Sequence, residues 1–130
     1  MSYAITVRLS AGFGPTLDRV RAALKDQGFG VLTEIDMRST LREKLGIGME
    51  DYVILGACNP PLAHRAVQAD PAIGLLLPCN VVVRAEGPDT TVVQGMDPQV
   101  MVQLSEAPEL WAIADEAAAR LRAALDAVAT

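Results

Sequence analysis

A run of six residues from Tyr52 to Ala57, with the sequence Tyr-Val-Ile-Leu-Gly-Ala, is apolar at every position. A strand that is apolar on both sides must keep both of its faces from water. The run therefore predicts a central strand, covered on both faces by its own chain or on one face by a partner. Because 130 residues is the ordinary length of one domain, we expect residues 1–130 to form a single domain.

Segments with strand and helix patterns alternate along the rest of the chain. Strands are predicted from period-two alternation or from runs of β-branched and apolar residues, at 3–9, 29–37, 52–57, 79–85 and 90–94. Helices are predicted from apolar residues that recur three and four apart, at 15–27, 41–45, 61–69 and 108–128. Residues 72–77 fit either a second short helix or an extended linker. Residues 96–104 are expected to form a loop or a partial strand.

The order of these elements predicts the fold class. A strand and a helix are followed by two strands with a small helix between them, a helix, a hairpin and a long helix. This order favours an α+β fold with one mainly antiparallel sheet of about five strands and helices packed on one face. Since aromatic residues make up only 4% of the chain, the core must be aliphatic.

The charge of the chain argues against a nucleic-acid-binding protein. Its formal net charge is −5, and its 11 basic residues are scattered rather than clustered. Arg120 and Arg122 lie two apart on the predicted last helix and so point in different directions. Binding to polyanionic nucleic acid draws on clustered Lys and Arg side chains, so we predict no nucleic-acid partner.

The hydropathy pattern argues against a membrane protein. No window of about 20 apolar residues is present, so no transmembrane helix is expected. The N-terminus alternates apolar and polar residues and lacks the basic start and continuous apolar run of a signal peptide. We therefore expect a cytoplasmic protein, in which thiols stay reduced and a permanent disulfide is not formed.

The two cysteines are the strongest indication of chemistry. Each is followed by asparagine, as Cys58-Asn59 and Cys79-Asn80, and the single histidine, His64, lies between the two pairs. Each pair also lies where a predicted strand meets a loop. If the strands on either side of the 59–78 connection are antiparallel neighbours, Cys58 and Cys79 come to the same end of the sheet.

Three interpretations of the thiols stay open. One is a redox pair, in which the N-terminus of the following helix favours the Cys58 thiolate and Cys79 resolves the intermediate. Another is a soft-metal site with His64, but no strong zinc motif and no fourth ligand is evident, so we predict no metal and no cofactor. The third is that both cysteines are small buried core residues, as free cysteines commonly are.

The polar neighbours of the cysteines also have structural explanations. Asn59 is a natural N-cap for the helix that Pro60 and Pro61 begin. His64 is more typical of a surface or capping histidine. Asn80 is harder to explain, because it opens a strand, where asparagine is unfavourable. Its amide is expected either to hydrogen-bond the turn at 57–60 or to point into a pocket.

Three segments carry a resemblance to a known family. They are Gly28–Asp36, Ile54–Pro60 and Leu76–Val83, and the paired Cys-Asn motifs are their most specific feature. From about residue 10 to 128 the chain resembles the DUF302 family of small bacterial and archaeal proteins. The resemblance implies a compact α+β domain and a homodimer. It implies no established activity, and it assigns no catalytic residue.

Two functional hypotheses follow. The preferred one is a non-enzymatic dimeric domain that binds a small ligand or a protein, with a shallow pocket at the cysteine end of the sheet. The alternative is a thiol-dependent redox or sulfur-handling protein. The sequence leaves open whether the chain is an enzyme. The candidate site residues are Cys58, Asn59, His64, Cys79 and Asn80.

Overall fold

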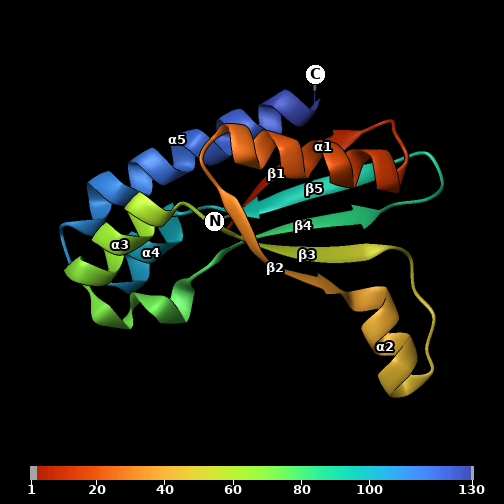
Figure 1. Ribbon diagram of the computed structural model, residues 1–130, viewed down its shortest axis with the longest axis horizontal. Coiled ribbons are helices and arrows are strands. Elements are labelled where there is room, and N and C mark those ends of the chain that lie inside the picture. Colours follow the sequence, from red (N-terminus) through yellow and green to blue (C-terminus); the bar gives the residue numbers. More distant parts are fainter. Residues whose placement is uncertain (1–2, 130) are drawn as a thin grey trace.

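Five strands form one antiparallel sheet in the order β1-β5-β4-β3-β2 within residues 3–129, the part of the chain that the computed structural model describes (Figure 1). The strands are β1 (Ala4–Leu9), β2 (Gly30–Asp36), β3 (Tyr52–Cys58), β4 (Cys79–Ala85) and β5 (Thr91–Met96). The helices are α1 (Phe13–Asp26), α2 (Met37–Leu45), α3 (Pro60–Ala69), the 3-10 helix η1 (Pro71–Leu76), α4 (Gln99–Leu104) and α5 (Leu110–Ala129). The predicted α+β class and antiparallel sheet are confirmed.

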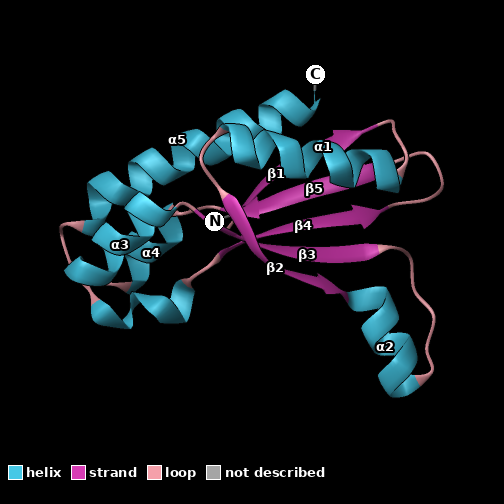
Figure 2. Cartoon of the chain, in the orientation of Figure 1, coloured by secondary structure: helices cyan, strands magenta, loops and turns pink. Residues whose placement is uncertain are grey.

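The main core lies between one face of the sheet and helices α1 and α5, which run across that face (Figure 2). Leu55, Val81 and Val93 point from three neighbouring strands toward the helices and are fully buried. Val20 and Leu125 meet them from α1 and α5. The core is almost entirely aliphatic, as the composition requires, and each fully buried side chain of this size contributes about 1.5–3 kcal/mol to stability.

A second core lies beside the sheet, under the connection between β3 and β4. Its buried members come from α3, η1, α4 and the first half of α5, and they are Leu62, Ala66, Ile73, Met101, Leu110, Ile113, Ala114 and Ala117. Helix α5 is long enough, at 20 residues, to contribute to both cores. It therefore ties the helical end of the molecule to the sheet.

The segment at 96–104 does not form the predicted loop or partial strand. Met96 ends β5, and Gln99–Leu104 form the helix α4. The Asp97 carboxylate accepts a hydrogen bond from the Gln99 N–H at 3.0 Å, which satisfies a free donor at the start of the helix. Because α4 has six residues and buries only Met101, it is too short to show a helical period in the sequence.

Two smaller expectations are also settled. The open segment at 72–77 is helical, since Pro71–Leu76 form η1. Helix α2 spans Met37–Leu45 and so begins four residues before the predicted helix at 41–45. Its N-cap is Asp36, whose carboxylate accepts a hydrogen bond from the Ser39 N–H at 3.0 Å. This bond also lowers the pKa of the Asp36 carboxyl group.

The expected alternation of β2 is broken by a bulge. Val31 pairs with Ala57, but the next paired residue, Thr33, is opposite Gly56. Residues that are opposite each other share a face of the sheet, so the bulge moves Thr33 away from the helices and toward the other face. A Cβ atom at position 56 would overlap the Thr33 side chain, which explains the glycine there. Every residue of β2 is exposed.

Gly95 gives a test of how closely α5 packs on the sheet. A Cβ atom added there would lie 2.9 Å from Leu121 Cδ2 and 3.3 Å from its Cγ. Since Leu121 is fully buried, Gly95→Ala should lower the free energy of unfolding by about 1–3 kcal/mol, measured by urea denaturation. Gly14→Ala is the control, because nothing lies within 4 Å of the added atom. Equal stability of the two variants would contradict this packing.

Candidate functional site

The β3–β4 pairing brings the two cysteines to one end of the sheet. The strands are antiparallel neighbours, and Ala57 is directly opposite Cys79. Cys58, the next residue after Ala57, is therefore close to Cys79, as the topological argument from the sequence required. Both thiols are free; Cys79 is buried, and Cys58 is half-buried.

Both cysteines line a small apolar cavity between the two cores. The cavity has a volume of about 30 Å³. Its walls come from the ends of β3 and β4 and from α3, α4 and α5, and they are formed by Phe29, Ala57, Cys58, Asn59, Leu62, Ala63, Ala66, Leu77, Pro78, Cys79, Met101, Ile113 and Ala117. No charged side chain is among them. Sites for small metabolites have volumes of about 300–1,000 Å³, so this cavity has room for one or two atoms of a ligand at most.

The environment of Cys79 keeps it protonated. Burial raises the pKa of the Cys79 thiol from 9.0 to about 11, and the neighbouring Cys58 adds to the shift. The thiolate is the form that attacks a disulfide or a substrate. At neutral pH Cys79 is therefore a thiol with the character of a small apolar side chain.

Asn59 and His64 lie where their structural explanations place them. Asn59 is the N-cap of α3, and its side-chain oxygen accepts a hydrogen bond from the Leu62 N–H at 3.2 Å. His64 is exposed on α3 and is not among the residues that line the cavity. The structure thus brings Cys58, Asn59 and Cys79 together and leaves His64 outside.

Asn80 lies on the other face of the sheet. It follows Cys79 directly in β4 and is opposite Gly56, so its side chain points away from the helices. There it lines a hollow of about 310 Å³. The residues around the hollow are Tyr3, Ala4, Tyr52, Asn80, Val82, Gln94, Gly95 and Met96. Of the two alternatives for Asn80, the pocket is therefore the one that the structure supports.

Sequence reasoning missed most residues of this hollow. Tyr52, Val82 and Gln94 lie on three neighbouring strands, and only the pairing register places them side by side. The sequence signal that could have placed them on one face is the period of two along each strand. Within each strand these residues alternate with the core residues, which assigns them to the opposite face.

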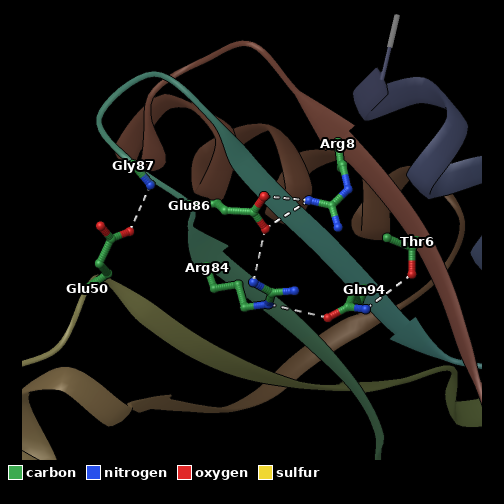
Figure 3. A network of polar contacts seen from close by, with 7 residues as sticks. All are labelled: Thr6, Arg8, Glu50, Arg84, Glu86, Gly87 and Gln94. Carbon is green, nitrogen blue, oxygen red and sulfur yellow. Dashed lines mark hydrogen bonds and ion pairs between the residues drawn. The ribbon is translucent and has the colours of Figure 1, made fainter.

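A polar network lies beside the hollow on the same face (Figure 3). One Arg8 nitrogen donates to both carboxylate oxygens of Glu86 at 2.8 Å, and Arg84 donates to the same carboxylate at 3.4 Å. The bond from Arg8 is the main reason that the pKa of Glu86 is lowered. Arg84 also donates to Gln94, which in turn donates to Thr6. The charges of this network are therefore engaged with one another.

The described part of the chain contains neither a cluster of metal ligands nor a membrane-spanning helix. Within residues 3–129, no group of three or more His, Cys, Asp or Glu side chains is arranged to hold a metal ion. None of the helices in the same range has the length and apolar composition needed to cross a bilayer.

Comparison with known proteins identifies the family. The profile of the family described as "Domain of unknown function DUF302" matches residues 5–128. The chain belongs to the DUF302 family. A crystal structure of an uncharacterised conserved DUF302 protein from Bacillus stearothermophilus is similar, with 35% sequence identity, a TM-score of 0.89 and coverage of 98% of both chains. A search of curated proteins finds no match.

Membership in DUF302 confirms the resemblance and the fold, but it adds no activity. The family is described as having unknown function, and the related structure is described as uncharacterised. Any function for this DUF302 protein must therefore be argued from its own surface and cavities.

The raised pKa of Cys79 predicts a pH dependence of stability. Between pH 9 and about 11 the unfolded chain loses the Cys79 proton, whereas the folded chain keeps it. The free energy of unfolding should therefore fall through this range by about 1.4 kcal/mol for each pH unit. The measurement is urea denaturation from pH 8 to 11. Cys79→Ala is the control, because it removes this thiol and keeps every other side chain, and parallel profiles for the two proteins would contradict the prediction.

Proposed function

We propose that this DUF302 protein is a non-enzymatic binding domain that works as a homodimer. Each copy uses the face of the sheet opposite α1 and α5, here called the open face, together with the segment at residues 30–48, here called the β2–α2 arm. In the dimer, the second copy covers the open face, which no helix of the same chain covers. The observation that carries the proposal is the absence of any buried residue in the arm.

The arm exposes several large apolar side chains and has no core of its own. Its side chains that are large, apolar and exposed are Val31, Leu32, Ile35, Leu45 and Ile47. Helix α2 has nine residues and projects from the end of the sheet (Figure 1). A helix of this length gains most of its stability from packing, and packing on a second copy would provide it. Exposed apolar patches of this kind mark interaction surfaces.

The arm is continuous with an apolar row on the open face. Ile35 in β2 is opposite Ile54 in β3, and Ile54 is opposite Val82 in β4. Residues opposite each other share a face, so these three side chains form a line across the sheet. In a dimer with twofold symmetry, this row would pack against the equivalent row of the second copy. This row also accounts for the apolar side chains on both faces of β3, which lies next to the edge strand β2 rather than at the centre of the sheet.

The choice of a second copy as the partner rests on the family resemblance, which implies a homodimer. A self-complementary aliphatic row fits this choice, because obligate dimer interfaces resemble a domain core cut in half. The choice of a non-enzymatic role rests on the two concave sites that the candidate residues line, the cavity at Cys58, Asn59 and Cys79 and the hollow at Asn80. Neither the small cavity nor the hollow is lined by a charged side chain, and Cys79 remains a thiol at neutral pH. The thiol-redox alternative gains no support from this geometry.

The oligomeric state tests the proposal. In sedimentation velocity at micromolar concentration, the protein should have twice the 13.8 kDa mass of one chain. Ile35→Lys should weaken the dimer at least tenfold, because it places a charge in the apolar row. Val67→Lys on α3 is the matched control, since Ile35 and Val67 are both 44% exposed. A wild-type protein that sediments as a monomer would refute the proposal, as would equal effects of the two substitutions.

A further inference from the structure

The hollow on the open face has the dimensions of a ligand site. Its volume of about 310 Å³ lies at the lower end of the range for small-molecule pockets. The cavity beside the cysteines, at about 30 Å³, is ten times smaller. By volume, the hollow can hold a small molecule, whereas the cavity beside the thiols cannot.

The walls of the hollow favour a flat ligand. Tyr52 and Tyr3 contribute aromatic rings, and Met96 contributes a thioether. Aromatic rings pack well against other flat π-systems, and the sulfur of methionine makes favourable contacts with aromatic groups. Val82 and Ala4 complete the apolar part of the lining. A small aromatic or heteroaromatic ring would bury apolar area against all of these groups.

Of the two side-chain amides in the hollow, that of Asn80 is free to bind a ligand. Within the described residues the side-chain amide of Asn80 makes no hydrogen bond. The amide of Gln94, in contrast, is held at both ends, by Arg84 Nε at 3.4 Å and by Thr6 Oγ1 at 3.2 Å. An asparagine amide offers donors and an acceptor side by side. The group most complementary to it is another carboxamide, or a ring edge with the same pattern.

The charge of the site argues for an uncharged ligand. None of the residues that line the hollow is Asp, Glu, Lys or Arg. The nearest charged row contains Arg84, and that guanidinium is engaged by Glu86 and Gln94. A charged ligand would lose hydration without gaining a counter-charge. A neutral ligand would not carry this cost.

We infer that the hollow binds a small, flat, uncharged ligand with a carboxamide-like edge, which the Asn80 amide recognises. The inference rests on the proposed function in one respect, because the second copy packs over the same face and closes the hollow from above. The ligand is then held between the two copies, and its affinity depends on the dimer.

Benzamide is a suitable probe, and its binding can be followed by amide chemical shifts in two-dimensional NMR. Benzamide should shift the signals of Asn80, Val82 and Gln94. Benzoate, which has the same shape with a negative charge, should bind at least tenfold more weakly. Cyclohexanecarboxamide, which is neutral but not flat, should also bind more weakly.

Matched variants assign the binding to Asn80. Asn80→Ala should weaken benzamide binding about fivefold to tenfold, because it removes a hydrogen-bonding partner. Gln68→Ala removes an exposed amide from α3, away from the hollow, and should leave the affinity unchanged. Equal affinities for benzamide and benzoate would overturn the inference, and so would an unchanged affinity in Asn80→Ala.

The Ile35→Lys variant separates this inference from the proposed dimer. Weaker benzamide binding to this variant than to the wild type is the expected result. Binding to the variant alone would mean that the second copy fills the hollow, which overturns the inference and leaves the dimer standing. Binding to a wild-type protein that sediments as a monomer would refute the dimer and keep the ligand site. Absence of hollow shifts in both proteins would overturn the inference.

Discussion

The structure depends on one constraint: a sheet has two faces, and this chain places helices on only one of them. Leu55 and Val81 point into the main core and are fully buried. Their strand neighbours Ile54 and Val82 point the other way and are half-buried. Burial of aliphatic area against α1 and α5 stabilises the fold, since each such side chain contributes a large fraction of the net stability of a domain. The same pleat leaves an apolar row on the open face. One face of the sheet thus stabilises the fold by packing against α1 and α5, and the open face keeps apolar side chains that no helix of the same chain covers.

The pleat also explains why the Cys-Asn motif does not form one site. Successive side chains of a strand point to opposite faces, so Cys79 turns toward the core while Asn80 turns toward the hollow. Cys79 and Asn80 therefore have different structural roles. Cys79 fills space beside an apolar cavity, where burial keeps it protonated. Asn80 provides a polar group on a largely apolar surface. At the first motif the arrangement differs, because Asn59 follows the last residue of β3 and caps α3.

The sequence predicts the parts of this fold that depend on local periodicity. Strands with period two, and the long helix with apolar residues three and four apart, were identified at nearly their observed positions. The short helix α4 was missed because six residues show no clear period and only Met101 is buried. The β2 bulge was missed because it is a property of the pairing with β3, which leaves Thr33 opposite Gly56. The hollow was missed for the same reason: its walls come from strands far apart in the chain, and register alone brings them together.

The cavity lined by the cysteines and the hollow lined by Asn80 differ in what they offer a ligand. A cavity inside an aliphatic core has few polar groups to orient a molecule, and the single amide among its lining residues, that of Asn59, uses its oxygen to cap α3. Specific recognition needs a few well-placed polar groups within an apolar surround. That combination occurs on the open face, where Asn80 stands beside Tyr52 and Val82. The aliphatic row that favours a second copy runs through Val82 into the same hollow. Dimer formation and ligand binding are therefore expected to be coupled, because one surface serves both.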